Sequence, residues 1–214
     1  MKSRFREPIS GLIHLFSAIL SFAGLIFLLG IPEGDRLVKI SVGVYGVSLV
    51  LLFSASAAYH LIRTGEPGLG RLRKLDHAAI YILIAGTYTP ICIHFLSGSL
   101  RIGFLVLIWV FATMGVAIKI FMINAPRWIT AGVYLFMGWM VVFVIKPLLG
   151  TIPAAGWLWL TAGGVLFTIG AVVYITKKLD FFPGVFGFHE VWHVFVTMAC
   201  FCHFVLIYQY VAGA

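Results

Sequence analysis

Long apolar stretches dominate the hydrophobic pattern of this 214-residue chain, and short clusters of charged, proline and glycine residues separate them. A transmembrane helix needs roughly 20 consecutive apolar residues, and seven stretches meet that length. They are too long for the strands of a membrane barrel and lack the alternation of such strands. We place the seven helices near residues 9–31, 38–62, 76–96, 102–123, 128–147, 155–176 and 186–211.

Composition excludes a soluble domain. Hydrophobic residues make up 62% of the chain and charged residues only 10%, so a soluble fold could not hide the apolar surface. We therefore predict an all-α membrane protein, with residues 1–214 forming a single seven-transmembrane-helix bundle. The first helix follows Glu7 and Pro8, and no small-residue cleavage site follows its apolar centre, which favours a retained helix over a signal peptide.

Basic residues predict the orientation in the cell membrane. Positively charged loops resist translocation, so the side with more Lys and Arg is expected to be cytoplasmic. With the N-terminus inside, eleven of the fifteen basic residues are cytoplasmic, and four are outside: Arg36, Lys39, Arg101 and Lys146. The C-terminus is then external. The net charge of +8 is explained by this topology, and nothing suggests nucleic acid as a partner.

The segment His189-Glu190-Val191-Trp192-His193 opens the last apolar stretch. Residues four apart on a helix lie about 40° apart on one face, so the two imidazoles can share one metal ion. Histidines at a membrane helix are costly without a partner. A metal with further ligands from other helices would be that partner.

Two other segments carry candidate ligands to the same depth. Ser56 and His60 share a helix face at the end of the second stretch, and Asp76 begins the third stretch, after a turn-rich loop over residues 63–74. In the predicted topology, His60, Asp76, His189 and His193 all lie on the cytoplasmic side. This convergence predicts a tetrahedral zinc site. The alternative for Asp76 is an acid that stabilises the first turn of its helix.

Two further histidines, His14 and His94, lie in the apolar stretches. His14 belongs to a stripe of small and polar residues that should face the bundle, where it either hydrogen-bonds a neighbouring helix or contributes to the site. That stripe is formed by Ser10, His14, Ser17, Ser21 and Gly24. His94 should lie near the opposite membrane surface, too far away to join the same ion.

Three ordered motifs carry a family resemblance. They are Ser56-x-x-x-His60, Asp76 with the following Gly86-Thr87-Tyr88-Thr89-Pro90, and His189-x-x-x-His193. Together they resemble the signature motifs of the progestin and adipoQ receptor family, in particular its bacterial hemolysin III branch. The resemblance covers nearly the whole chain and implies seven helices with an internal N-terminus.

The resemblance also implies roles for these residues. Zinc would be held by His60, His189 and His193, Asp76 would hold the zinc-bound water, and Ser56 would lie beside it; Glu190 is not part of this pattern. The family is similar to the alkaline ceramidases, and its animal members are linked to ceramide hydrolysis. For bacterial members it implies a hemolysin label and a role in membrane lipid homeostasis.

The function predicted from these residues is zinc-dependent hydrolysis of a lipid amide within the membrane. Three neutral ligands leave zinc its charge and an open position, which acidifies a coordinated water. Asp76 would accept the proton of that water and return it to the leaving amine, and Ser56 would donate to the developing oxyanion. Expected partners are membrane lipids, with a lipid amide or fatty acid as ligand.

Three alternatives remain open from the sequence. A receptor or sensor would use the same zinc structurally, without turnover. An intramembrane metalloprotease would read His189-Glu190-x-x-His193 as a zincin motif, with Glu190 as general base and Asp76 as a ligand, but this leaves His60 unexplained. A lytic or channel-forming protein would need a continuous polar path, which the sequence does not show.

Overall fold

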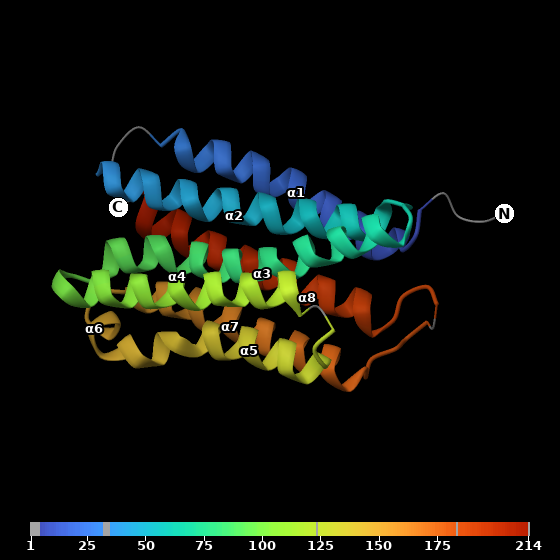
Figure 1. Cartoon of the computed structure of the whole chain (residues 1–214). Coiled ribbons are helices and arrows are strands. Elements are labelled where there is room, and N and C mark those ends of the chain that lie inside the picture. The colour runs from blue at the N-terminus through green and yellow to red at the C-terminus, as the bar shows by residue number, and fades with distance from the viewer. Residues whose placement is uncertain (1–4, 32–34, 123, 183, 214) are drawn as a thin grey trace.

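The computed structural model describes residues 5–31, 35–122, 124–182 and 184–213 (Figure 1). Within them, seven helical segments are long and apolar enough to cross a membrane, which confirms the predicted all-α fold. The elements are α1 (Pro8–Leu29), α2 (Arg36–Leu61), α3 (Glu66–Phe95), α4 (Gly98–Phe121), α5 (Arg127–Trp139), η1 (Met140–Val144), α6 (Ile145–Leu149), α7 (Ala154–Thr176), α8 (Phe188–Ile207) and η2 (Tyr208–Ala212). Segments α5, η1 and α6 make one span, as do α8 and η2.

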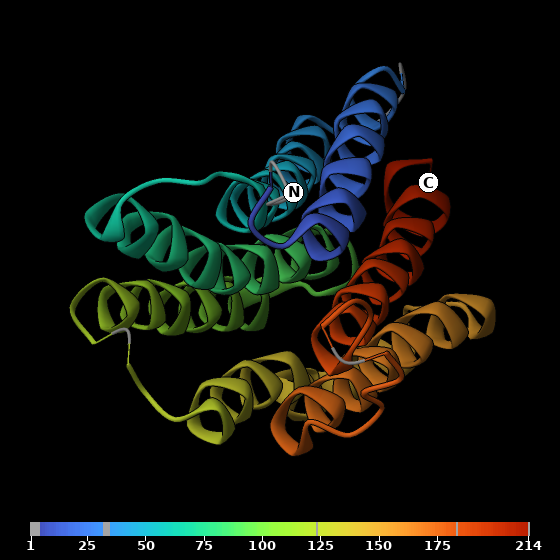
Figure 2. The same ribbon diagram turned by 90° about the vertical axis from the view of Figure 1, so that its right-hand side faces the viewer.

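Most helices that follow one another in sequence pack side by side, but α4 and α5 do not. The main contacts join α1 to α2, α2 to α3, α3 to α4, and α7 to α8. Helix α8 also contacts α1, and in Figure 2 it lies between α1 and α7. The start of α1 and the end of α8 lie at opposite ends of the bundle (Figure 1). Of the residues used to predict orientation, Lys2 and Arg4 lie outside the described ranges.

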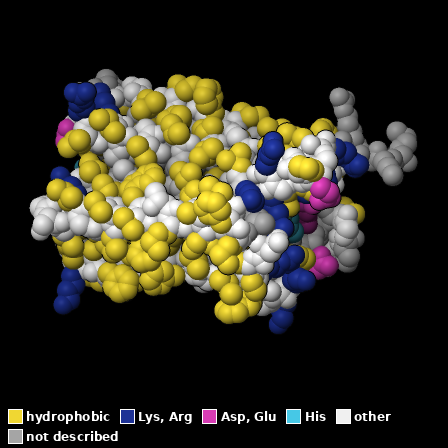
Figure 3. Space-filling view, viewed as in Figure 1, with side chains coloured by type: hydrophobic (Ala, Val, Ile, Leu, Met, Phe, Trp, Pro, Cys, Tyr) yellow, Lys and Arg dark blue, Asp and Glu magenta, His cyan; other side chains and the backbone are white. Residues whose placement is uncertain are grey.

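The outer surface is that of a multi-pass membrane protein. Hydrophobic side chains cover the middle of the face in Figure 3, whereas Lys, Arg, Asp and Glu side chains gather toward its two ends. On α1, Phe16 and Ile19 are 62% and 60% exposed. Such a continuous apolar surface would aggregate in water and is explained by contact with lipid.

Glycines let α7 and α8 approach closely. A side chain at Gly163 would collide with the ring of His203, and one at Gly170 would meet Phe195 and Trp192, all of them on α8. Small residues at helix contacts are the usual means of close packing in a membrane, where no hydrophobic force drives helices together.

Helix α3 begins ten residues earlier than predicted, at Glu66 instead of Asp76. Pro67 stands in its first turn, where a missing N–H costs no hydrogen bond, so the proline that suggested a loop in fact starts a helix. Asp76 therefore lies about three turns into α3. The interpretation of Asp76 as a first-turn residue is wrong.

The fifth span is also not the single helix that the sequence predicts. The hydroxyl of Tyr88 donates to the carbonyl of Gly138 at 2.6 Å and accepts from the N–H of Val141 at 2.8 Å, next to the 3₁₀ segment η1. A side chain from α3 thus satisfies backbone groups at the break, which a membrane interior requires. These two hydrogen bonds hold the backbone at Gly138 and Val141 against α3.

Candidate metal centre

Three histidines from two helices meet at one end of the bundle. His60 comes from the last turn of α2, and His189 and His193 come from the first turns of α8. One ligand nitrogen from each lies within 4.8 Å of the others. The Nε2 atoms of His189 and His193 are 3.1 Å apart. The structure thus brings together the three histidines named from the sequence.

This donor set is suited to a metal ion. His60 and His193 are only 1% and 2% exposed, and the Nδ1 of His193 has no hydrogen-bond partner among the described residues. Buried imidazole nitrogens without partners are costly, and a metal ion would satisfy several of them at once. Three neutral imidazoles leave an open position, as in catalytic zinc sites.

Glu7 holds His60 from outside the membrane span. Its Oε2 lies 2.5 Å from the Nδ1 of His60, and its backbone N–H donates to the His60 carbonyl at 2.9 Å. The hydrogen bond to His60 lowers the pKa of the Glu7 carboxyl. With Nδ1 paired to a carboxylate, Nε2 is the nitrogen left for an ion, an arrangement common around metal-bound histidines. Sequence reasoning missed this role because the two residues are far apart in the chain.

Ser56 and Asp76 lie beside the histidines. Both are buried, with 2% and 8% exposure, and they line the same cavity as the histidines. The Ser56 hydroxyl interacts with the Asp76 carboxylate, and the Oδ2 of Asp76 lies 3.3 Å from the Nδ1 of His77. The site therefore contains an acid and a hydroxyl next to the three imidazoles. His77 was not expected from the sequence.

His14 is a fourth histidine at the cluster. Its ring centroid lies 3.8 Å from that of His193, with 32° between the ring planes. It is 3% exposed, and neither ring nitrogen has a hydrogen-bonding partner in the described part of the chain. His14 therefore packs against His193 of the neighbouring helix α8, beside the predicted ligands. His94 lies in the last turn of α3, at the other end of that helix from Asp76.

Glu190 has two structural partners. Its Oε1 accepts from the Ser10 hydroxyl at 2.7 Å, and its Oε2 accepts from the N–H of Gly187 at 2.9 Å. The second bond caps the start of α8, and the first ties α8 to α1. Both carboxylate oxygens are thus engaged away from the histidines. This geometry does not suit a general base at the metal.

A cavity of about 590 Å³ extends from this cluster into the bundle. Deeper in, its wall is mainly aromatic and aliphatic, from α3, the broken fifth span, α7 and α8. Representative lining residues are Ile84, Ile91, Val142, Trp157 and Phe167. This volume falls in the range of small-molecule sites. The site thus has a polar end with titratable groups and an apolar interior.

Comparison with known proteins identifies the relatives of this chain. The family described as haemolysin-III related matches residues 2–204. The chain is 38% identical to hemolysin-3 of Bacillus cereus over 205 residues, 92% of this chain and 89% of that protein. It is 36% identical to the hemolysin-3 homolog of Bacillus subtilis (strain 168), over 89% of this chain and 87% of that protein. It is also 28% identical to the human monocyte to macrophage differentiation factor, over 80% and 71% respectively.

Proposed function

This chain belongs to the haemolysin-III related family, and we propose that it is a zinc-dependent hydrolase of membrane lipid amides. One observation carries the proposal: His60, His189 and His193 meet beside Asp76 and Ser56 at the polar end of a largely apolar cavity. Enzymes that act on lipids need this combination, because the reacting bond is polar and the chain beside it is not.

The three histidines are the proposed zinc ligands. When bound, zinc supplies a Lewis acid and an acidified water at the open position. Glu7 keeps the His60 ring in one tautomer and one orientation through its bond to Nδ1. Burial of His60 and His193 keeps bulk water away from the ligands. These residues therefore hold and orient the proposed centre.

Asp76 and Ser56 are the proposed catalytic residues. Unlike Glu190, the Asp76 carboxylate beside the cluster neither caps a helix nor links two helices. It would take a proton at Oδ1 or Oδ2 and deliver it to the leaving amine. Ser56 would donate its hydroxyl proton to the substrate carbonyl oxygen as charge develops there. The cavity beyond them would receive an acyl chain, and His77 would keep Asp76 oriented.

A receptor or sensor with structural zinc is the second candidate. The observation that favours it is that His60 lies on α2 whereas His189 and His193 lie on α8, and α1 packs against both helices. A metal held by all three would tie α2 to α8 without any chemistry. The zincin reading is less well supported, because Glu190 is engaged with Ser10 and Gly187. The names of the bacterial relatives point to lysis, but the apolar depth of the cavity does not support a conducting path.

An assay of lipid cleavage distinguishes the hydrolase from the receptor or sensor. Purified, zinc-loaded protein is incubated with fluorescently labelled lipid amides and with the matching esters, with and without a chelator. Release of the labelled acid that stops on chelation and returns with zinc supports the hydrolase. An intact zinc site with no cleavage of any lipid would contradict it and favour the receptor or sensor.

A further inference from the structure

Three cations belong to the helices around one end of the cavity: Arg73 on α3 and Arg127 on α5 line it, and Lys119 on α4 is buried behind the lining residue Thr130. We call them the cationic mouth. Among the described residues, no carboxylate lies within 4.0 Å of any of the three, since the ion pairs found there involve Arg6, His60 and His77.

Lys119 is the most unusual member of the cationic mouth. It is only 2% exposed, and its Nζ donates to the Thr130 hydroxyl at 2.8 Å. Thr130 in turn lines the cavity. Arg73 lies close enough to repel the buried ammonium. A buried cation with a second cation nearby and no counter-ion is costly, and an anion between them would remove that cost.

Arg127 is oriented by aromatic contacts. Its guanidinium carbon lies 5.2 Å from the ring centroid of Tyr174 and 5.3 Å from that of Phe188. Tyr174 lines the same cavity as Arg73, Arg127 and Asp76. Arg127 also begins α5, whose N-terminus has no side-chain cap, which adds positive potential at the same place.

The acids of the cavity are already engaged. Glu7 pairs with His60 and Arg6, and the two oxygens of Glu190 accept from Ser10 and Gly187. Asp76 interacts with His77 and Ser56. The positive charge of the cationic mouth is therefore not neutralised by the carboxylates that share its cavity.

We propose that the cationic mouth binds the phosphate-bearing headgroup of the lipid that enters the cavity. Guanidinium groups match phosphate oxygens bidentately, and two of them with an ammonium balance its negative charge. The headgroup then lies at the end of the bundle, the linkage next to the histidines and the chain in the apolar depth. That the linkage is cleaved rests on the proposed function, but binding of the headgroup does not.

Lipid binding to the full-length protein in a neutral detergent tests the proposal. Short-chain phosphatidic acid, phosphatidylcholine and ceramide with equal chains are titrated, with inorganic phosphate as a separate ligand. Phosphatidic acid should bind at least about 10-fold more tightly than ceramide, with phosphatidylcholine between them because choline offsets the charge of its phosphate. Equal affinities would overturn the proposal. Inorganic phosphate binding as tightly as phosphatidic acid would also overturn it, by identifying a free anion as the ligand.

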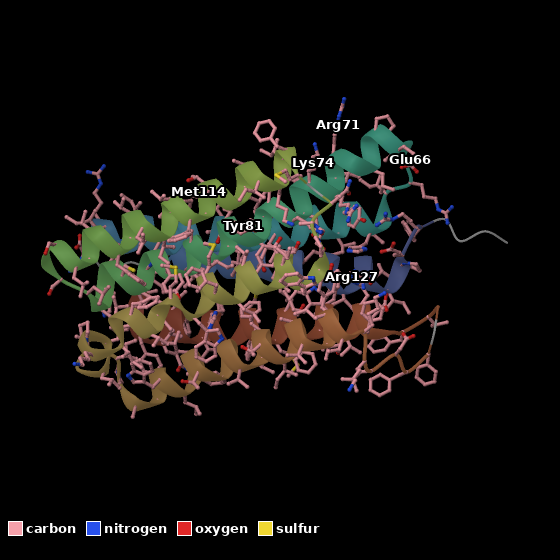
Figure 4. All side chains as sticks on the ribbon, turned by 60° about the horizontal axis from the view of Figure 1, so that its bottom comes forward. Glu66, Arg71, Lys74, Tyr81, Met114 and Arg127 are labelled. Carbon is pink, nitrogen blue, oxygen red and sulfur yellow. The ribbon has the colours of Figure 1, made fainter. Side chains whose placement is uncertain are left out.

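Variants locate the site. Arg73→Gln and Arg127→Gln should each weaken phosphatidic acid binding about 10-fold, and the Lys variants should lose less, because they keep the charge but not the bidentate geometry. Arg71→Gln is the matched control, because Arg71 lies on the same helix and extends away from the bundle in Figure 4, where Arg127 is also labelled. An equal loss in Arg71→Gln would indicate general surface attraction and contradict the proposal.

Lys119→Met gives a second readout that does not depend on the arginines. Removing a buried charge should leave the unliganded protein at least as resistant to heat, but phosphatidic acid should then raise its melting temperature less than in wild type. An undiminished shift would contradict a role for Lys119. If binding follows this pattern while no lipid is cleaved, the proposed hydrolase fails and the headgroup site stands. If a lipid amide is cleaved but phosphatidic acid binding is unchanged in both Gln variants, the headgroup site fails and the proposed hydrolase stands.

Discussion

The Oε2 of Glu7 lies 2.5 Å from the Nδ1 of His60, and the backbone of Glu7 donates to the carbonyl of the same histidine. Two bonds thus connect the residue just before α1 to the end of α2. A carboxylate in this position fixes which imidazole nitrogen is free for a metal.

Replacing Glu7 with Gln tests this role. We expect zinc affinity to fall about 10- to 100-fold, the usual cost of losing a carboxylate that orients a metal-bound histidine. Competition with a chromogenic chelator measures it. Glu66→Gln is the control, because Glu66 is an exposed acid at the same end of the bundle. Unchanged affinity in Glu7→Gln would show that His60 is positioned without it.

The three histidines should each be needed for metal binding. We expect about one zinc per chain in the wild type and strong loss in His60→Ala, His189→Ala and His193→Ala, since two ligands remain in place of three. Elemental analysis of purified protein measures the zinc. His94→Ala, at the other end of α3, should keep full occupancy. Full zinc retention in His60→Ala would exclude it as a ligand.

Asp76 should separate chemistry from metal binding. Asp76→Asn is expected to keep most of the zinc and to lose hydrolysis of a labelled lipid amide, because it cannot carry a proton. Ser56→Ala should reduce the rate about 10- to 1000-fold, and Glu190→Gln should be milder. The opposite ranking, an inactive Glu190→Gln enzyme and loss of zinc in Asp76→Asn, would favour the zincin mechanism.

Chain-length preference should respond to the depth of the cavity. Gly164 lines it, and a Cβ added there would meet only Trp139, at 4.0 Å. Gly164→Leu should therefore fold and shift preference toward shorter acyl chains, by filling space that a longer chain would occupy. Rates or affinities over a chain-length series measure the shift. Gly103→Leu, on the exposed face of α4, is the control, and an identical profile in both variants would place the chain elsewhere.

Orientation remains a prediction from the basic residues. Because the start of α1 and the end of α8 lie at opposite ends of the bundle, reporters fused to the two termini should give opposite results. We expect a periplasmic-type reporter to be active at the C-terminus and inactive at the N-terminus. The inverse pattern would move the histidine cluster to the outer face of the membrane.

The sequence by itself determined the seven spans and part of the site. Spans follow from apolar length, which is a local property that needs no packing. His189 and His193 share a face because helix geometry is regular, so their spacing alone predicted that the two imidazoles lie close together. In the structure two of their nitrogens are 3.1 Å apart. The predicted topology then placed His60 and Asp76 at the same depth, although α3 begins ten residues before Asp76.

Local rules failed where the contacts are between distant parts of the chain. Pro67 fits a loop and a helix start equally well, and the structure places it in the first turn of α3. The break in the fifth span depends on the Tyr88 hydroxyl, which no pattern in that span reveals. Sequence periodicity could predict neither of these features.

Only the tertiary structure decided which side chains complete the site. Glu7 and His60 are 53 residues apart, and the ring of His14 meets that of His193 across two helices. Likewise, Arg73, Lys119 and Arg127 come from three helices. A side chain's neighbours across helices depend on how each helix is rotated and how closely it packs. Those quantities are set by the whole bundle, since each face is fixed by the side chains that it must bury.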